Sequence, residues 1–545
     1  MTTIPDVTVV VAVYNTMPYL TECLNSLVGQ TIGLDRLEVV AVDDGSTDDS
    51  AAELDRFAAR YPDTFKVLHQ PNSGGPAAPS NRALEVATGR FVYFIGSDDY
   101  LGEEALERMV ACADEHVSDI VIGKMVGTNG RYVHQALYKK NDPDISLYDS
   151  ALPFTLANTK LFRRELVEKY GLRFPEDMPV GSDQPFTIEA CVRASKISVL
   201  GDYTYYYAVK RGDSSNITYR ADHMARLRCT ERIMAHAAEL IEAGPKRDTV
   251  FKRHFTWELA KLVQDDFPSL PRETQRQLCA GIGRLADEYF TDALRDSMDV
   301  KRRVRICLAR LGAVDQLVRA ISEESAQGVP PFSLEGGRAF ACYPGFRDET
   351  LGLPDRAYEL IGESASGTLA AGTELVALEW VQTDESLLLD LSVRVRVVGD
   401  IESLVVRLVP GAMPKGADKP GGRRLSAGHE LPPVEVRGEF SRKPSDDGLG
   451  TVLRGRIPVA AVKSKRGVRV YADVAGSTYE IPVKTGGRPL PLARRWQQAV
   501  PYRVSANANP KGRLVITTAP LWETKSGVGT RLRRKLSRLK RKVTR

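Results

Sequence analysis

Apolar runs alternate with amphipathic segments over the first 110 residues. The runs are short and rich in β-branched residues, as in buried strands, whereas the segments between them repeat apolar residues at helical spacing. Strands that are apolar throughout, joined by crossovers long enough for a helix, predict an α/β fold with a mostly parallel sheet covered on both faces. We predict strands at Val7–Val13, Glu38–Val42, Lys66–His69 and Phe91–Ile95, and helices at Tyr19–Gly29 and Asp48–Arg60.

The pattern changes twice further along the chain. Residues 223–324 carry apolar side chains at i, i+3 and i+4 spacing, which predicts a helical segment, and a Gly/Pro-containing linker follows at 325–337. Short alternating runs separated by Gly, Pro and Asp turns then predict all-β, immunoglobulin-like sandwich modules. The domains that we expect are 1–222 (α/β), 223–324 (helical), 338–430 and 431–524 (two β modules) and 525–545 (a tail).

The composition is that of a globular protein, with 43% hydrophobic and 27% charged residues over 545 positions. No apolar stretch approaches the ~20 residues of a membrane-spanning helix, and the first residues lack the features of a signal peptide. Seven scattered cysteines form no CxxC or Cys/His cluster, so neither a disulfide framework nor a structural zinc site is expected. These features predict a cytoplasmic protein.

The positive charge is concentrated at the C-terminus. Residues 525–545 contain ten Lys and Arg and no acid, so the preceding residues carry a net charge of −5. A basic amphipathic helix of this kind predicts peripheral attachment to anionic lipid at the inner face of the cell membrane, with polyanion binding and disorder as alternatives. Nucleic-acid recognition is not expected, because no aromatic and basic binding module accompanies the tail. The apolar face of such a helix would hold Leu532, Leu536, Leu539 and Val543.

Acidic residues directly follow two of the predicted strands, where ligands of parallel sheets bind. In VVAVDDGSTDDS, Asp44 is placed to accept hydrogen bonds from a pyrimidine N–H or ribose hydroxyls, and Gly45 lets the backbone turn sharply. In FVYFIGSDDY, Asp98 and Asp99 repel one another unless a divalent cation, bridging a diphosphate, removes that cost. A turn followed by a helix cap, and a solvated turn, are the alternatives without ligands.

Four motifs together resemble the family-2 glycosyltransferases of the GT-A fold, in family order and approximate spacing. They are VAVYN at 11–15, VDDGSTD at 42–48, NSGGP with a later Asn at 72–81, and SDD at 97–99. The resemblance covers about residues 5–220. It implies a GT-A catalytic domain that moves a sugar from a UDP-sugar donor, with inversion and with Mn²⁺ or Mg²⁺ as cofactor.

The resemblance also implies roles for single residues. Asp44 would contact the uracil, and Asp98 and Asp99 would hold the ribose and the metal ion on the diphosphate. Two positions depart from the family: Gly96 stands where an Asp is usual, and Ser80 where an Arg is usual, with Arg82 two positions later. The other residues assigned to the nucleotide sugar are Val13 and Asn15 in the first loop, and Asn72 and Asn81 in the loop and helix that follow the third strand.

A further acidic residue supplies the candidate general base. Sugar transfer with inversion needs a carboxylate within about 3 Å of the acceptor hydroxyl, on the face of the donor opposite UDP. The stretch MPVGSDQPFTIEA offers Asp183, and the family commonly has Glu-Asp where this chain has Ser182-Asp183. Glu176 and Asp177 are weaker candidates, and a helix-capping role for Asp183 is the alternative without catalysis.

Residues 205–218 resemble the family segment that closes over the donor. Arg211 would neutralise the charge of the diphosphate, and Ser214 or Ser215 would donate to a phosphate oxygen. The tyrosines at 205–207 equally suit a half-buried strand. His223 is a candidate third metal ligand, although a lone His in the first turn of a helix more often has no such role.

The order of α/β, helical and β regions looks like that of the wall teichoic acid glycosyltransferases, the poly(ribitol-phosphate) N-acetylglucosaminyltransferases. That resemblance implies transfer of GlcNAc or a related hexose to a cell-envelope polymer, an anionic acceptor and a homotrimer formed through the C-terminal region. Lys139, Lys140, Arg163 and Arg164 would suit such an acceptor, or form an ordinary solvated surface. A catalytically weak scaffold that binds nucleotide sugars is the alternative function. A nucleotidyltransferase is disfavoured because the N-terminus lacks a Gly-rich basic loop.

Overall fold

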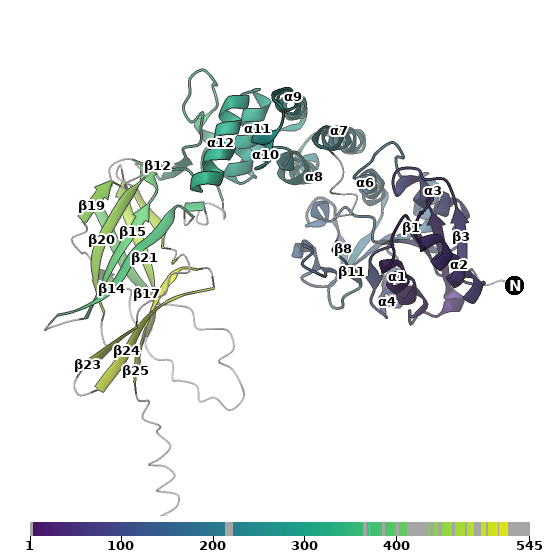
Figure 1. Cartoon of the computed structure of the whole chain (residues 1–545), viewed down its shortest axis with the longest axis horizontal. Coiled ribbons are helices and arrows are strands. Elements are labelled where there is room, and N and C mark those ends of the chain that lie inside the picture. Colours follow the sequence, from purple (N-terminus) through teal and green to yellow (C-terminus); the bar gives the residue numbers. More distant parts are fainter. Residues whose placement is uncertain are drawn as a thin grey trace, which may run out of the picture. The chain divides into compact units, whose positions relative to one another are not determined.

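A computed structural model describes fifteen stretches of the chain, which form two compact units: Met1–Met298 with Arg305–Val318, and Asp299–Val304 with Arg319–Arg545 (Figure 1). The stretches are residues 4–212, 222–362, 368–369, 371–383, 387–398, 403–410, 434–436, 441–444, 450–459, 464–474, 477–483, 485, 492–497, 500–510 and 512–521. The basic tail at 525–545, Ser214 and Ser215 lie outside these stretches, so the predictions made for them stay predictions.

The first unit is built on a mixed sheet whose four N-terminal strands are parallel, as expected. The strand order is β3-β2-β1-β4-β9-β6-β10-β8, with β1 to β4 parallel to one another and β9 antiparallel to both of its neighbours. All four predicted strands exist, with ends that shift by at most one residue. The strands are β1 (Val7–Val13), β2 (Leu37–Asp43), β3 (Phe65–His69), β4 (Phe91–Gly96), β6 (Ile120–Gly123), β8 (Asp142–Ile145), β9 (Leu161–Arg163) and β10 (Ile197–Leu200).

Helices join these strands (Figure 1), and a small second sheet includes β5 and β7, which come shortly after β4 and β6 in the chain. The order of the second sheet is β5-β11-β7, which confirms the strand interpretation of the tyrosines: Tyr206 is buried on β11. The elements are α1 (Tyr19–Val28), α2 (Ser50–Arg60), α3 (Ala77–Val86), α4 (Ala105–His116), α5 (Arg164–Lys169) and α6 (Asp183–Arg193), with β5 (Tyr100–Leu101), β7 (Met125–Gly127) and β11 (Tyr206–Ala208).

The predicted helical segment packs on the α/β region instead of forming a separate body. Most of it belongs to the same compact unit, which extends to Met298 and also contains Arg305–Val318. In this unit α6 packs against α7, and α7 packs against the π-helical segment η5. The boundary that we expected between 222 and 223 therefore does not separate two units. The elements are α7 (His223–Leu240), α8 (Pro245–Arg253), η5 (His254–Leu259), α9 (Arg272–Tyr289), α10 (Asp292–Asp296), α11 (Val300–Arg310) and α12 (Val314–Gln327).

The second unit corrects two boundaries. The expected linker at 325–337 contains β12, which pairs with β13 and β16. Strands on either side of the expected module boundary also pair with one another, β15 with β20 and β17 with β21, so the described strands do not divide into modules at 338–430 and 431–524. The antiparallel sheets have the orders β14-β15-β20-β19 and β18-β17-β21-β25-β24-β23, with β22 beside β21.

The strands of this unit are β12 (Phe332–Glu335), β13 (Arg338–Ala341), β14 (Thr373–Gln382), β15 (Leu387–Val395), β16 (Val397–Val398), β17 (Ser403–Pro410), β18 (Val434–Val436), β19 (Ser441–Pro444), β20 (Thr451–Pro458), β21 (Ser464–Val474), β22 (Ser477–Pro482), β23 (Leu492–Gln497), β24 (Val500–Ala508) and β25 (Leu514–Pro520). All seven cysteines are free thiols in this structure. Within the described stretches, none of the helices has the length and apolar character needed to cross a bilayer.

An aromatic cluster holds α6 on the sheet. Phe186 of α6 is 2% exposed and stacks on Phe174 with ring centroids 4.3 Å apart. It also meets the edges of Phe94 and Phe162, at 5.5 Å and 5.3 Å, and these two side chains come from β4 and β9. Aromatic pairs in these geometries add to the free energy of burial. The cluster therefore fixes the first turn of α6 relative to the carboxyl end of β4.

We expect Phe186→Ala to lower the free energy of unfolding by about 3–5 kcal/mol, because it leaves a cavity among three buried rings. Urea titration followed by circular dichroism measures the loss. The matched control is Tyr132→Ala, which truncates a ring that is 77% exposed and should cost less than about 0.5 kcal/mol. A loss below about 1 kcal/mol for Phe186→Ala would contradict the packing role of the cluster.

Candidate active site

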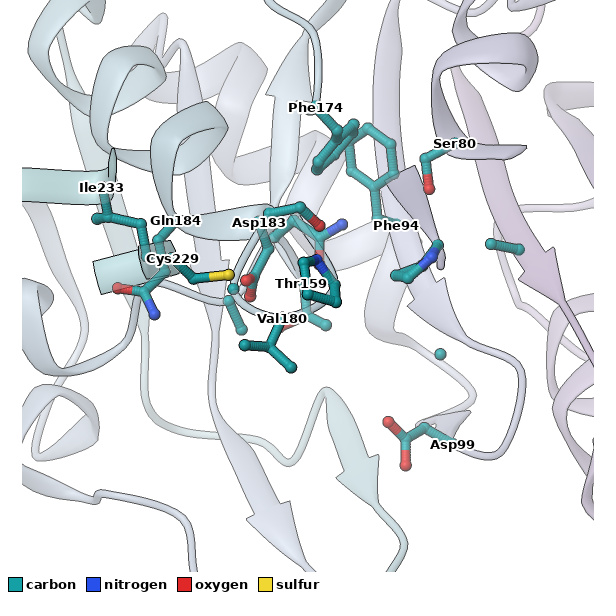
Figure 2. Close-up of a pocket in the computed structure, with 18 of the residues that line it drawn as sticks. Ser80, Phe94, Asp99, Thr159, Phe174, Val180, Asp183, Gln184, Cys229 and Ile233 are labelled. Carbon is teal, nitrogen blue, oxygen red and sulfur yellow. The ribbon is translucent and has the colours of Figure 1, made fainter. Parts of the chain in front are cut away.

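A cavity of about 470 Å³ opens beyond the carboxyl ends of β1 and β4. The loop after β4 contributes Asp98 and Asp99, and the start of α6 contributes Asp183 and Gln184. Figure 2 shows that Asp99 and Asp183 come from separate parts of the lining. The helical region also reaches the cavity, through Arg226, Cys229, Thr230, Ile233, Arg253, Glu258 and Lys261. The cavity thus joins the two acidic sites predicted separately from sequence.

Asp44 follows β2 and is held by donors from the loop after β3. Its carboxylate accepts hydrogen bonds from Gln70 Nε2 (2.6 Å), Ser73 N (3.0 Å), Ser73 Oγ (2.9 Å) and Asn72 Nδ2 (3.4 Å). Its own amide donates to Val13 O at 2.8 Å. The side chain is 3% exposed, so these bonds replace the water that a buried carboxylate loses. The structure therefore brings Asp44, Val13 and Asn72 together.

The sequence analysis did not predict Gln70, which links Asp44 to Arg82. Arg82 Nη1 donates to His69 O (3.0 Å) and to Gln70 Oε1 (3.3 Å), and Gln70 in turn binds Asp44. The Arg that seemed two positions late in the motif thus supports the end of β3. The available signal for Gln70 was its place directly after a predicted strand.

Asn15 connects the first two loops of the carboxyl edge. It adopts a left-handed conformation (φ 46°), and its side-chain oxygen accepts hydrogen bonds from Thr47 N (2.7 Å) and Asp48 N (3.3 Å). Gly45 also has a positive φ (75°), and a Cβ there would lie 2.7 Å from the backbone N of Asn72. Only glycine suits so close an approach of the two loops.

Asp98 and Asp99 are paired to the segment that follows β11. Arg211 Nε donates to Asp98 Oδ2 at 2.6 Å, and the two side chains are 14% and 13% exposed. Asp99 accepts hydrogen bonds from Tyr206 Oη and from Val209 N, each at 2.6 Å. Burial, and next the charge of Asp98, raise the pKa of Asp99 to about 6. The solvated-turn alternative is therefore wrong.

Gly96 is the position at which the chain lacks a family acid. A Cβ at this position would lie 2.9 Å from Asp99 Oδ2 and 3.2 Å from Asp98 Oδ1. A third carboxylate would add both a steric conflict and a like charge. The glycine therefore allows the two remaining acids to sit close together.

The acids at 98 and 99 suit a metal ion that arrives with its substrate. Mg²⁺ in proteins is usually bound by one or two carboxylates together with phosphate and water. Asp98 Oδ1 makes no hydrogen bond to any described residue, so this oxygen is open to a cation. The described part of the chain holds no cluster of three or more His, Cys, Asp or Glu arranged as metal ligands. His223 instead pairs with Asp266 at 3.1 Å, and the structure does not bring it to Asp98 and Asp99.

Asn81 acts as a clamp within the chain. Its Nδ2 donates to Phe174 O (2.8 Å) and Glu176 Oε1 (2.9 Å), and its Oδ1 accepts from Phe174 N (2.9 Å). Both amide hydrogens are thereby used, so the structure does not bring Asn81 to the donor side of the cavity as predicted. Ser80 beside it does line the cavity.

Asp183 is the first residue of α6, and its carboxylate makes no hydrogen bond to another described residue. The capping alternative is not realised, because the N-terminus of α6 has no side-chain cap. Burial raises the pKa of Asp183 above its ordinary value, against the opposing charges of Arg253 and Lys160. The weaker candidates are engaged elsewhere: Glu176 with Asn81, and Asp177 with Arg232. Asp183 therefore has the unpaired, basic carboxylate that a general base requires.

The basic residues at the cavity differ from those predicted. Arg163 and Arg164 pair with Asp119 and Glu168 respectively, and neither lines the cavity; nor do Lys139 and Lys140. The cavity instead has Arg131, whose Nη1 lies 3.3 Å from Asp99 Oδ1, and Arg226, Arg253 and Lys261 from the helical region. These residues occur outside any motif, so tertiary packing alone brings them to the site.

The chain is similar in sequence to known glycosyltransferases. The profile of glycosyl transferase family 2 matches residues 8–171, and that of the glycosyl transferase TarS linker domain matches residues 227–321. The chain is 42% identical over 214 residues to a poly(ribitol-phosphate) beta-glucosyltransferase of Bacillus spizizenii, covering 39% of this chain and 34% of that protein. It is 43% identical over 204 residues to the Staphylococcus aureus poly(ribitol-phosphate) beta-N-acetylglucosaminyltransferase TarS, covering 37% and 35%.

A solved structure extends the comparison through the helical region. The crystal structure of S. aureus TarS 1-349 in complex with UDP-GlcNAc has a TM-score of 0.56 and 30% identity to this chain, covering 66% of this chain and 99% of that one. The fold is that of a GT-A glycosyltransferase. The chain belongs to glycosyl transferase family 2. The matched region spans about a third of the length of the two curated relatives.

We expect Tyr206→Phe to raise the pKa of Asp99 above its value of about 6, because it removes a hydrogen bond that favours the carboxylate. A ¹³C NMR titration of the aspartate carboxyl carbons measures this pKa. The matched control is Tyr207→Phe, because Tyr207 points to the opposite side of β11 and stacks on Tyr100. Equal pKa values in the two variants would show that the Tyr206 hydroxyl does not stabilise the charge on Asp99.

Proposed function

We propose that this chain is an inverting glycosyltransferase that moves a sugar, GlcNAc or a related hexose, from a UDP-sugar to a hydroxyl of a polyol-phosphate polymer of the cell envelope. One observation carries the proposal. A single cavity holds the acidic pair Asp98 and Asp99 at one place and the unpaired carboxylate of Asp183 at another. This reaction needs a metal ion that stabilises the departing UDP and a general base that accepts the proton of the acceptor hydroxyl.

The donor side is supported by the loops at the carboxyl edge of the sheet. The hydrogen bonds to Asp44 hold its carboxylate beside the ends of β1 and β2, where a uracil N–H would meet it. Arg131 and Arg211 already contact Asp99 and Asp98, so both guanidinium groups lie where a diphosphate would place its charge. The TarS fragment with similar fold is the one solved with UDP-GlcNAc.

Asp98 and Asp99 would hold Mn²⁺ or Mg²⁺. Such an ion, when bound, offsets the negative charge that develops on the departing UDP. Asp99 is kept in place for this role by Tyr206 and Val209, so the carboxylate needs no reorganisation when the donor binds.

Asp183 acts on the acceptor. As the acceptor oxygen bonds to the anomeric carbon, the bond from that carbon to the UDP oxygen breaks, and the hydroxyl proton passes to the Asp183 carboxylate. The raised pKa of Asp183 makes it a stronger base than an exposed aspartate. Attack from the side opposite UDP inverts the anomeric centre.

The names of two relatives support the proposed acceptor. Two relatives are named for poly(ribitol-phosphate), which favours a polyol-phosphate acceptor for this chain. A cytoplasmic location, attachment to the inner face of the membrane through 525–545, and a homotrimer stay predictions of the sequence.

We expect Asp183→Asn to lower the rate of sugar transfer by about 10²–10⁴-fold, because the amide cannot accept the hydroxyl proton. The measurement is UDP release from UDP-GlcNAc with a poly(ribitol phosphate) oligomer. Affinity for UDP should be unchanged. The control is Asp177→Asn, a nearby carboxylate that is 66% exposed and paired with Arg232. Binding of UDP by the wild-type chain without turnover of any UDP-sugar would favour the scaffold function instead.

We expect kcat/KM to rise with pH along an acid limb, because Asp183 acts in its deprotonated form and its pKa is raised. Asp99 contributes as well. Because its pKa is about 6, it becomes protonated below that pH and then binds the metal ion less tightly. Raising the Mn²⁺ concentration should move the part of the pH profile that Asp99 causes to lower pH, and it should leave the part that Asp183 causes unchanged. EDTA should abolish turnover. Full activity in EDTA would contradict the assigned metal role.

A further inference from the structure

Six buried side-chain atoms of α6, the end of α8 and η5 have no hydrogen-bond partner in the part of the chain that the structure describes. The atoms on α6 are Gln184 Oε1 and Thr187 Oγ1, and those on the other side are Arg253 Nε, His254 Nε2, Thr256 Oγ1 and Glu258 Oε2. Native proteins satisfy nearly all such groups, so a local concentration of unsatisfied ones indicates a place that water or a ligand fills.

The backbone at this place is also unusual. Residues His254–Leu259 form a π-helical segment between α8 and the chain that leads to α9. π-Helical turns are rare and occur frequently at functional sites. The irregularity and the unsatisfied atoms therefore point independently to the same wall of the first unit.

Three of the side chains line the cavity that contains Asp183: Gln184, Arg253 and Glu258. We call these three residues the polar wall. Glu258 Oε1 accepts hydrogen bonds from Arg253 Nη2 at 3.0 Å and from Gln184 Nε2 at 3.3 Å. Gln184 is 7% exposed and is adjacent in the chain to Asp183. Three buried atoms of the wall have no hydrogen-bond partner among the described residues: the acceptors Glu258 Oε2 and Gln184 Oε1, and the donor Arg253 Nε.

The unpaired atoms of the polar wall suit hydroxyl groups better than phosphate. An ionised phosphate diester offers only acceptor oxygens, and it would leave both vacant acceptors unsatisfied and lie against the Glu258 carboxylate. A hydroxyl donates one hydrogen bond and accepts others, so a pair of hydroxyls satisfies all three positions. The ion pair with Glu258 also offsets the charge of Arg253, which weakens its attraction for an anion.

We propose that the polar wall binds hydroxyl groups of the acceptor polyol and thereby selects the hydroxyl that reaches Asp183. Gln184, Arg253 and Glu258 are specificity-determining residues in this account. The proposal rests on the proposed function for the identity of the acceptor, whereas the hydroxyl chemistry of the wall rests on its own vacant atoms.

The test measures binding of two probes by isothermal titration calorimetry: a synthetic poly(ribitol phosphate) oligomer, and an inorganic polyphosphate of equal charge without hydroxyls. Glu258→Gln should weaken oligomer binding by about tenfold, the loss of a hydrogen bond to a charged group, and should leave polyphosphate binding unchanged or tighter. Gln184→Met keeps the side-chain volume and should weaken oligomer binding by about fivefold.

The matched control is Gln277→Met on the exposed side of α9. Gln277 Nε2 also donates to a glutamate, Glu273 Oε1, at 3.1 Å, but it lies outside the cavity. Its oligomer binding should equal that of the wild-type chain. Thermal unfolding and UDP affinity check that each variant is folded, and Gln184→Met keeps the test valid if Glu258→Gln, which leaves Arg253 unpaired, does not fold.

Tighter binding of both probes by Glu258→Gln would overturn the proposal, because it would show that the wall meets phosphate. Unchanged oligomer binding in both variants, or no oligomer binding by the wild-type chain, would also overturn it. Turnover of UDP-GlcNAc separates this inference from the proposed function. If the wild-type chain transfers sugar with an acceptor KM that both variants leave unchanged, the polar wall is refuted and the transfer stands. If it transfers nothing but binds the oligomer through these residues, the wall stands and the transfer does not.

Discussion

The burial of carboxylates at the carboxyl edge of the main sheet is the constraint on which the site depends. A carboxylate removed from water must receive hydrogen bonds from the protein, or its charged form is disfavoured. Asp44 receives them from the loop after β3, and Asp99 from β11 and the residue after it. Each donor comes from a different segment from its acid. Satisfying the acids therefore ties the loops of the donor side to one another before any ligand binds.

The acceptor side is organised differently. Asp183 is positioned by packing, through the Phe186 cluster on the same helix and the Asn81 clamp on the segment before it, and its carboxylate has no partner of its own among the described residues. Gln184, Arg253 and Glu258 beside it also keep vacant polar atoms. Preorganised acids at the carboxyl edge and unsatisfied polar atoms beside Asp183 are what the proposed transfer from a compact nucleotide sugar to an acceptor rich in hydroxyls requires.

The helical region belongs to the site. Arg253 and Glu258 lie some seventy residues after Asp183 in the chain, yet they line the same cavity. The apolar spacing from α7 to η5 predicts which residues are buried, but it does not predict what those residues contact. The sequence therefore could not show that one side of these helices lines a cavity. The same limit explains why the expected boundary between two β modules at 430/431 was wrong: alternation predicts strands, whereas pairing across 430/431 is a long-range property.

The sequence by itself determined the parallel strands β1 to β4, the acids that follow them, and the place of Asp183 at the start of a helix, because periodicity and strand-end position are local properties. It also identified the family, since four short motifs occur in order. Only the tertiary structure decided that Asn81 clamps the chain, that His223 lies against Asp266, and that Arg131, Arg253 and Glu258 reach the cavity. Those outcomes depend on contacts between side chains that are far apart in the sequence. Such side chains find their hydrogen-bond partners only when the folded chain packs them together.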